Sequence, residues 1–470
     1  MPSAALTLPR RAAAGERAAS PRAVLAVMCV GYFLVLLDVT IVNVALPTIA
    51  AGVGASVSGL QWVVDGYALA LASLMLAGGT VGDLGGHERV VLAGLVVFGA
   101  GSLACGLAPT TAVLVAARFV QGIGAALLLP GTLAIISHAF PEGPEQARAI
   151  GLWAGIGGLA LPAGPLLGGV LVDALGWRAI FLVNVPIVAV SFVAAAAIVH
   201  ESADRRGRTL DVRGVVSGAA LLAAITFACI EVGRDGAGSP TVIAAVVCAL
   251  LLAALFLVVE RRRGADAMLP LGLFRRRGFS VANAASAAMN LGTLGTLFVL
   301  TLFLQKVQGR SPIDAGLAIV PLFAPLAIIA PLAGRLVSKV GSRIPMAAGL
   351  AVAAVGLALL VAADAGTGYP TLLPAFLLWG IGLGILTPAV VAAAIAAVPS
   401  ERAGLASAIN NTSRQAGGAI GIAIAGGVAG APAAADFVGG FHAVAIAAAV
   451  LYTVAAVASL ALLPRRRLRG

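Results

Sequence analysis

Apolar residues dominate this chain in long stretches, and short polar segments separate them. We identify fourteen stretches of the length that an α-helix needs to cross a bilayer, about 20 residues. Turn-forming segments such as 108–111 and 366–370 lie between them. The pattern predicts an all-α integral membrane protein. The predicted helices cover residues 23–47, 59–81, 90–108, 111–138, 149–172, 178–199, 212–231, 241–260, 279–304, 314–337, 344–363, 370–398, 404–430 and 438–463.

The composition agrees with a membrane protein. Of the 470 residues 60% are hydrophobic and 10% are charged, whereas a soluble domain has about 25% charged residues. The longest polar segments, near 201–211 and 261–278, are too short for a soluble domain. The cysteines lie in apolar stretches and form no paired framework, so we expect no disulfide, metal site or cofactor. They are Cys29, Cys105, Cys229 and Cys248.

Lysine and arginine residues fall mostly on one side of the predicted membrane. With an even number of helices both termini share a side, and 24 of the 30 basic residues lie there. Another 4 lie on the opposite side, and 2 lie within predicted helices. Because cytoplasmic loops carry such an excess, we predict that both termini are cytoplasmic and that the protein resides in the cell membrane. The pI of about 10.6 then reflects topology and not nucleic-acid binding.

One carboxylate stands out within these apolar stretches. Asp38 is the only charged side chain between Ala23 and Val64. An ionised group at the bilayer centre costs roughly 2.5 kcal/mol or more, so Asp38 is expected to face protein or water and to handle protons or cations. Arg118 and Arg414 are the two basic residues within predicted helices, and Asp65 lies near the outer end of the second one.

The alternative for these residues is a structural ion pair buried between helices. Asp65 could instead reach the outer interface beside Trp62. Gln121 and Gly122 follow Arg118 at helical spacings of three and four. They therefore share a helix face with it, as the wall of a polar cavity would require.

Glycine and proline are concentrated in the fifth predicted helix, between residues 151 and 169. Glycines spaced by four allow close helix contact, and prolines permit bending. This segment is a tight seam, a hinge or a sealed helix pair. Two Gly/basic loops at 79–89 and 334–343 occupy corresponding positions in the two halves, which suggests an internal duplication. Walker, HExxH and GxSxG motifs are absent from the sequence, so we do not expect an enzyme.

Together these segments resemble the major facilitator superfamily and, within it, the fourteen-helix drug:proton antiporters of the EmrB/QacA type. Residues 37–47 match that group's helix 1 signature, and residues 118–125 match the superfamily's helix 4 motif. Residues 164–169 match the helix 5 motif associated with exporters. Segments 176–186 and 411–415 are also typical. The resemblance covers nearly the whole chain and is strongest to actinomycete-type antibiotic-resistance exporters.

The resemblance implies a major facilitator fold with 14 transmembrane helices, arranged as two six-helix bundles plus two inserted helices. The N-terminal bundle would comprise residues 23–200, the insert 201–278 and the C-terminal bundle 279–463. Cytoplasmic tails would cover residues 1–22 and 464–470. The substrate cavity would lie between the bundles and open alternately to each side.

The resemblance also implies roles for single residues. Asp38 is expected to carry the proton, Arg118 to adjust its proton affinity by approach and withdrawal, and Asp65 to take part in coupling or attract a cation. Candidates for the substrate cavity are Asn43, Trp62, Gln121 and Arg414. Candidates for the conformational change are Pro47, Asp83, Arg89, Gly122, Gly164, Pro165, Gly168, Gly334 and Arg343.

The loop between the second and third predicted helices departs from the family pattern. The family usually has basic residues after Asp83 and after the following glycine, and this loop helps to lock the two halves. Here Leu84, His87 and Glu88 stand at the expected basic positions, and Arg89 remains. We therefore expect a lock that is weaker or that depends on Arg89 alone.

The function we expect is proton-coupled export of multiple drugs or antibiotics, which would be hydrophobic and cationic or amphipathic. A small-cation:proton antiporter or a proton-coupled solute importer of the same fold is the alternative, and the helix 5 motif argues against import. The expected partners are a lipophilic small molecule, protons and the lipid bilayer. Some relatives use a periplasmic adaptor, which this chain does not encode.

Overall fold

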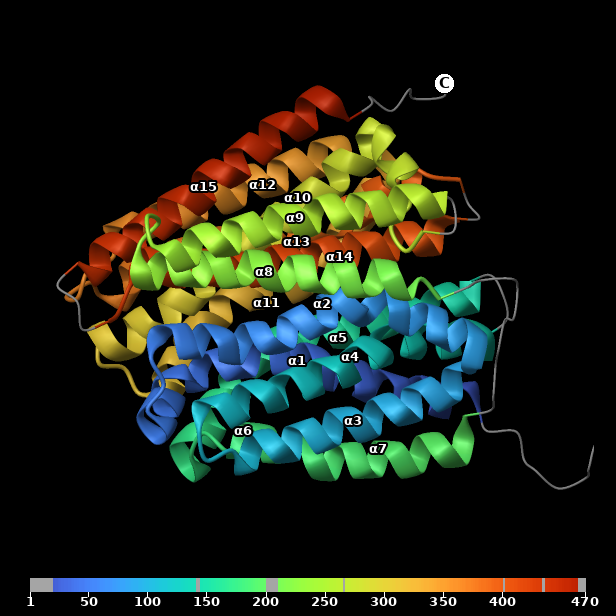
Figure 1. Cartoon of the computed structure of the whole chain (residues 1–470), viewed down its shortest axis with the longest axis horizontal. Coiled ribbons are helices and arrows are strands. Elements are labelled where there is room, and N and C mark those ends of the chain that lie inside the picture. The colour runs from blue at the N-terminus through green and yellow to red at the C-terminus, as the bar shows by residue number, and fades with distance from the viewer. Residues whose placement is uncertain are drawn as a thin grey trace, which may run out of the picture.

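The computed structural model describes residues 20–140, 144–199, 210–264, 267–399, 402–432 and 436–463. These residues form helices and connecting turns without a β-strand (Figure 1). Both predicted tails lie largely outside this described part, which begins at residue 20 and ends at residue 463.

The first half of the chain contributes seven helical segments. They are α1 (Pro21–Val53), α2 (Val57–Gly85), α3 (His87–Leu107), α4 (Thr111–Ala139), α5 (Pro144–Leu175), α6 (Ala179–Leu182) and α7 (Asn184–Ile198). The predicted helix at 178–199 is therefore divided at Val183 into α6 and α7.

The rest of the chain contributes α8 (Val212–Asp235) and α9 (Pro240–Arg263), followed by the last group of helices. That group contains η2 (Leu271–Arg275), α10 (Arg277–Leu302), η3 (Phe303–Val307), α11 (Pro312–Val340), α12 (Arg343–Leu359), η4 (Leu360–Ala362), α13 (Tyr369–Ala396), α14 (Ala403–Ala429) and α15 (Phe437–Leu462).

Among the described residues, thirteen helices are long and apolar enough to cross a membrane. The remaining long helix, α14, has 27 residues but a polar first half that includes Asn410, Asn411, Arg414 and Gln415. A helix with polar residues at membrane depth is tolerated where those residues face protein or a cavity. The count of fourteen therefore stays a prediction, with α14 as the additional helix.

Helix boundaries follow from local chemistry. The hydroxyl oxygen of Ser56 accepts a hydrogen bond from the Gly59 N–H at 3.2 Å, and that of Thr110 accepts one from Val113 at 3.4 Å. These N-caps satisfy amide groups that have no partner within the helix. Gly54 ends α1 with φ of +65°, a conformation that glycine adopts without a steric penalty.

The helices are arranged in two groups, α1–α7 and α10–α15, with α8 lying along the seam between them and α9 beside α8 (Figure 1). A Cβ atom on Gly233 of α8 would overlap the backbone of Gly427 in α14, so these two helices are in direct contact. The ring centroids of Phe227 in α8 and Trp62 in α2 are 6.4 Å apart. Helix α8 therefore contacts both groups.

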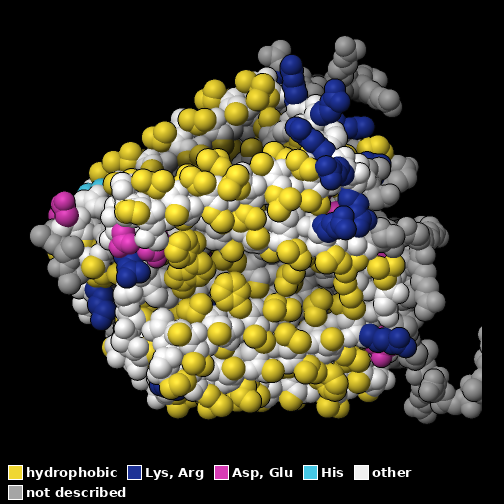
Figure 2. Space-filling view, viewed as in Figure 1, with side chains coloured by type: hydrophobic (Ala, Val, Ile, Leu, Met, Phe, Trp, Pro, Cys, Tyr) yellow, Lys and Arg dark blue, Asp and Glu magenta, His cyan; other side chains and the backbone are white. Residues whose placement is uncertain are grey.

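Basic side chains gather toward one end of the molecule (Figure 2). We call this the tail end, because α1 begins there and α15 ends there; Arg261–Arg263 at the end of α9 belong to it. The opposite end, where α1 ends and α2 begins, is the far end. The distribution agrees with the predicted charge asymmetry between the two sides of the membrane.

The two groups are closed against each other at the far end. A Cβ atom on Gly169 of α5 would lie 2.6 Å from the Cα of Ile313 in α11. The Gln61 side-chain amide of α2 donates hydrogen bonds to the backbone oxygens of Ile422 (3.2 Å) and Ala423 (2.8 Å) in α14. Glycine permits this backbone contact, and the amide satisfies carbonyl groups at the seam.

Candidate functional site

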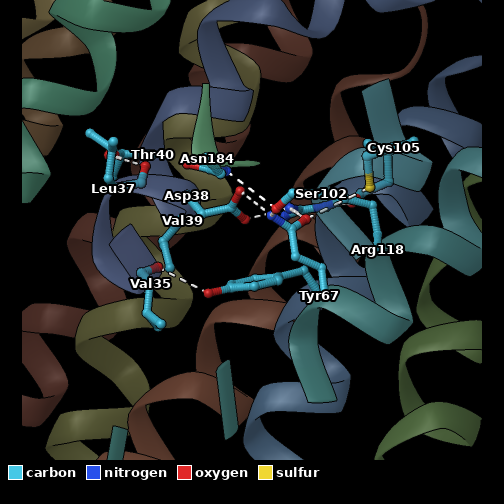
Figure 3. Close-up of polar contacts among 12 residues, drawn as sticks. Val35, Leu37, Asp38, Val39, Thr40, Tyr67, Ser102, Cys105, Arg118 and Asn184 are labelled. Atoms are coloured by element: carbon cyan, nitrogen blue, oxygen red, sulfur yellow. Dashed lines mark hydrogen bonds and ion pairs between the residues drawn. The ribbon is translucent and has the colours of Figure 1, made fainter. Parts of the chain in front are cut away.

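Asp38 and Arg118 form an ion pair in the middle of the first helix group (Figure 3). Asp38 lies at the centre of α1, and Arg118 reaches it from α4, with Nη1 donating to Oδ2. Both side chains are only 1% exposed. The ion pair that the sequence left as one interpretation is therefore present, and it is sealed from solvent.

A polar network extends from this pair. Gln121 donates hydrogen bonds from Nε2 to Asp38 Oδ1 at 2.8 Å and to Ser102 Oγ at 2.9 Å. Its Oε1 accepts a hydrogen bond from Arg118 Nη1 at 2.7 Å. Asn184, at the start of α7, donates to Ser102 at 3.4 Å. The pair thus connects α1 and α4 with α3 and α7.

Arg118 is also held by aromatic rings and a backbone carbonyl. Its guanidinium carbon lies 4.4 Å from the ring centroid of Tyr67 and 5.7 Å from that of Phe181. Its Nε donates to the Val63 carbonyl at 2.9 Å. Because a desolvated cation is stabilised by ring faces and hydrogen bonds, these contacts help to offset the cost of burying Arg118.

The packing of α5 against α1 follows from its prolines and glycines. Pro165 has no N–H, so the carbonyl of Leu161 one turn earlier has no intrahelical donor. The Thr40 hydroxyl of α1 donates to that carbonyl at 3.3 Å. A Cβ atom on Gly164 would overlap Thr40 Oγ1, and one on Gly168 would lie 2.9 Å from the Ile41 carbonyl. This segment is therefore a tight seam against α1.

A cavity of about 870 Å³ lies between the two helix groups, in their tail-end halves. It is lined by the last turns of α2 and α4, the first turns of α5 and α14, and the α8–α9 insert. The polar and aromatic side chains around it are Tyr32, Thr80, Asp83, His87, Ser137, Trp153, Asp211, Arg402, Ser407, Asn410, Asn411 and Arg414. The contacts that close the far end lie on one side of this cavity, so the cavity is on the tail-end side of the closed seam.

Asp38 lies deeper than the cavity wall. Tyr32 lines the cavity, and Asp38 follows it by six residues on α1. At 1.5 Å rise per residue, the carboxylate lies about 9 Å farther along the helix toward the far end. The ion pair is therefore at mid-helix depth, next to the helices that line the cavity.

Of the four residues predicted to line the substrate cavity, one lines the cavity of about 870 Å³ and three lie elsewhere. Arg414 lines the cavity, whereas Asn43, Trp62 and Gln121 are not among the lining residues of the described chain. Gln121 belongs to the buried network, and Asn43 donates to the Val39 carbonyl of its own helix at 3.0 Å. A role for these three in substrate binding stays a prediction.

Asp65 is fully buried in the far-end half of α2. Neither of its carboxylate oxygens has a hydrogen-bond partner among the described residues. Gly66 beside it packs close to Phe119 of α4. A buried carboxylate without partners is costly in its ionised form. Asp65 therefore does not reach the outer interface in this conformation, which was the alternative interpretation.

The loop that departs from the family pattern contributes Asp83 and His87 to the cavity lining. His87 Nε2 is 3.3 Å from Asp83, and a Cβ atom on Gly82 would overlap the His87 ring. His87 is 3% exposed, whereas Arg89 lies on the surface. A histidine therefore occupies the place beside Asp83, and Gly82 provides the room for it.

The other predicted conformational residues have structural contacts. Gly122 lets α4 approach α2, because a Cβ atom there would lie 2.5 Å from the Tyr67 carbonyl. Arg343 donates from Nε to the Leu460 carbonyl at 2.9 Å and so joins α12 to the end of α15. Pro47 is buried within α1. A Cβ atom on Gly334 would lie 3.9 Å from the Cβ of Pro388, which is ordinary van der Waals contact.

Several residues of the site were not predicted from the sequence. Ser102, Asn184 and Tyr67 complete the network, and Tyr32 and Trp153 line the cavity. A single serine or tyrosine in an apolar helix gives no signal of its own. Asn184 lies in a segment that resembles the family, which was the available clue. Within the described residues, no group of three His, Cys, Asp or Glu side chains could hold a metal ion.

Comparison with known proteins agrees with this architecture. The model of the Major Facilitator Superfamily matches residues 28–422. The chain is 40% identical to the multidrug resistance protein Stp of Mycobacterium tuberculosis over 398 residues, which is 85% of this chain and 74% of Stp. It is 36% identical over 416 residues to the methylenomycin A resistance protein of Streptomyces coelicolor, covering 88% and 87% of the two chains.

A solved structure shows the same fold at low sequence identity. The nucleoside transporter NupG superposes with a TM-score of 0.68 at 11% identity, over 94% of this chain and all of that chain. This similarity concerns the fold alone. The family match over residues 28–422 and the relatives that are 40% and 36% identical establish that the chain belongs to the Major Facilitator Superfamily.

Proposed function

We propose that this protein is a proton-coupled exporter of multiple drugs or antibiotics, which moves hydrophobic or amphipathic compounds by alternating access. It acts as a carrier and not as an enzyme. The names of its relatives support export, since they include multidrug and antibiotic resistance proteins. The observation that carries the proposal is the sealed Asp38–Arg118 pair, next to a cavity between two helix groups that are in contact at the far end.

The proton step can be written for the residues present. A proton that binds Asp38 neutralises the carboxylate that now accepts a hydrogen bond from Arg118. Arg118 then keeps Gln121, the Val63 carbonyl and the Tyr67 ring as partners. Because the bond between α1 and α4 is weakened, the two helices can shift and favour the opposite opening. Release of the proton restores the pair.

The seam between α5 and α11 is the contact that must open for release at the far end. Asp173 of α5 accepts a hydrogen bond from the Ile313 N–H at 3.2 Å, and Gly316 packs directly on the Pro165 carbonyl. A rigid-body motion of one helix group against the other would separate these contacts without unfolding a helix.

The orientation follows from charge. We assign the tail end to the cytoplasm, because it carries the excess of arginine. The cavity is then open to the cytoplasm, where an exporter collects its substrate. Residence in the plasma membrane would give it access to a proton gradient. The volume of about 870 Å³ suits an organic molecule better than a small cation.

The driving force is sufficient for export. One proton moving down about 1 pH unit and about 100 mV releases roughly 1.4 plus 2.3 kcal/mol. For a neutral substrate this supports a concentration gradient of several hundred-fold. One proton per cycle is therefore enough for resistance to a neutral compound.

Efflux from energised cells tests the proposal. Cells that express the chain are loaded with rhodamine 123, a cation, or with carboxyfluorescein, an anion. We expect extrusion of at least one dye, abolished by an uncoupler and by Asp38→Asn. Asp235→Asn serves as the control because that acid lies at the protein surface, 38% exposed, beside Arg234. Uncoupler-insensitive extrusion, or full activity in Asp38→Asn, would contradict the proposal.

A further inference from the structure

The cavity wall holds a pair of stacked aromatic rings. Tyr32 of α1 and Trp153 of α5 have ring centroids 3.9 Å apart and planes inclined by 16°. A Cβ atom on Gly157 would overlap the Tyr32 ring, so the glycine makes room for it. Both side chains line the cavity. They provide a flat apolar surface of the kind on which planar ring systems stack.

Arg414 brings a positive charge to the same cavity from the other helix group. Its Nη2 donates to Asn411 Oδ1 at 2.6 Å, and Asn411 is a neutral amide. Among the described residues no carboxylate lies within ion-pair distance of Arg414. A guanidinium group has five N–H donors in a planar arrangement that fits a carboxylate or another planar oxyanion. Most of these donors are available to a ligand.

The carboxylates of the cavity wall are engaged elsewhere. Asp83 lies beside His87 at 3.3 Å. Asp211 accepts backbone hydrogen bonds from Gly214 at 3.0 Å and Met268 at 3.2 Å. In addition, Asp211 Oδ1 lies 3.6 Å from Arg263 Nε.

Among the described residues, the other charged side chains of the wall are positive. Arg402 lines the cavity as well as Arg414. In addition, the Trp153 indole N–H has no hydrogen-bond acceptor among the described residues. The cavity thus offers donors and positive charge beside an aromatic surface, and its described carboxylates, Asp83 and Asp211, already have partners within the protein.

We propose that this cavity selects planar aromatic compounds that carry an anionic oxygen group, with the rings at Tyr32 and Trp153 and the anion at Arg414. This inference rests on the proposed export function and narrows its substrate class. The sequence alone favoured cationic or amphipathic compounds. A lipophilic cation would approach Arg414 without a free carboxylate to receive it.

A matched set of probes tests the charge preference. The purified protein in lipid nanodiscs is equilibrated with 1-pyrenebutyrate, 1-pyrenebutanol or 1-pyrenebutylammonium, and empty nanodiscs serve as the blank. These probes share one ring system and differ in charge. We expect the anion to bind at least about tenfold more tightly than the cation. Equal or tighter binding of the cation, or no binding of any probe, would overturn the inference.

Variants assign the preference to the named residues. Arg414→Gln should remove the preference for the anion, and Arg414→Lys should retain part of it because the charge remains. Arg234→Gln, an exposed position at the far end, is the control and should change nothing. Trp153→Leu should weaken all three pyrene probes, whereas Trp153→Phe should preserve binding. An unchanged preference in Arg414→Gln would also overturn the inference.

Transport separates this inference from the proposed function. If proteoliposomes export all three probes in a proton-dependent way and without preference, the exporter proposal stands and the anion selectivity is wrong. If the anion binds selectively but none of the probes moves with a proton gradient, the exporter proposal is wrong. Proton-dependent export of the anion, reduced in Arg414→Gln, supports both.

Discussion

At the scale of single residues, the central feature is a charge pair buried in an apolar protein. A buried ion pair gains little net stability over apolar residues, because both groups lose their hydration. Asp38 and Arg118 are nevertheless 1% exposed and enclosed by Gln121 and Tyr67. We therefore propose that this pair serves proton handling and not stability.

The pair should be energetically coupled. Asp38→Asn or Arg118→Gln alone leaves one charge buried without its partner, and we expect a loss of about 3 to 5 kcal/mol of stability. The double variant replaces both charges and should recover at least half of that loss. Thermal unfolding of the detergent-solubilised protein measures this, as a fall in Tm that the second substitution partly reverses. Additive losses in the double variant would show that the two side chains do not act as a pair.

The sequence predicted some residues of the site and not others. Asp38 and Arg118 were found because charged residues are rare in membrane-spanning helices. Ser102 and Asn184 were not found, because one uncharged polar residue costs little in an apolar helix. Trp153 was not found because an aromatic side chain at a cavity and one facing lipid give the same sequence signal. Only the packing of helices distinguishes them.

At the scale of elements, α5 shows how glycine positions divide one helix between two neighbours. Gly164 and Gly168 contact α1, whereas Gly169 contacts α11 of the other helix group. A Cβ atom on Gly155 or Gly158 would meet open space. The sequence predicted a seam or hinge over this whole segment. It could not predict which glycines face a helix, because that depends on how α5 is rotated.

Substitution should distinguish a glycine that contacts a neighbouring helix from one that meets open space. Gly169→Leu places a side chain against the α11 backbone, whose Ile313 Cα would be 2.6 Å from the new Cβ. We expect it to open the far-end seam and to abolish transport. Gly158→Leu is the matched control on the same helix. It should leave the far-end seam closed and transport unchanged.

Accessibility of a reporter cysteine measures the opening. Gln61→Cys lies at the closed far end, where Gln61 contacts α14. Labelling by a membrane-impermeant maleimide from the far side should be faster in Gly169→Leu than in Gly158→Leu. Equal labelling in the two variants would show that the α5–α11 contact does not hold this end closed.

At the scale of the whole molecule, the hydrophobic pattern predicted the fold class and nearly all helices. The segment at 178–199 differs from the prediction, because the helix is broken at Val183 into α6 and α7. Helix α14 was predicted at 404–430, and its polar first half includes Asn410, Asn411 and Arg414, which line the cavity.

The state of the transporter could not be predicted from the sequence. Whether the cavity opens at the tail end or the far end depends on contacts between the helix groups, such as Gln61 with Ala423. The same sequence must support the opposite opening too. The position of α8 across the seam is likewise a property of the assembled helices (Figure 1).

The most direct test is proton movement coupled to transport in proteoliposomes. With an entrapped pH dye and an imposed substrate gradient of 1-pyrenebutyrate, the wild-type protein should move protons in the direction opposite to the probe. Asp38→Asn should abolish that proton movement, and Asp235→Asn should not. Probe transport without proton movement in the wild type, or equal proton movement in Asp38→Asn, would contradict the account of a proton-coupled exporter that uses the Asp38–Arg118 pair.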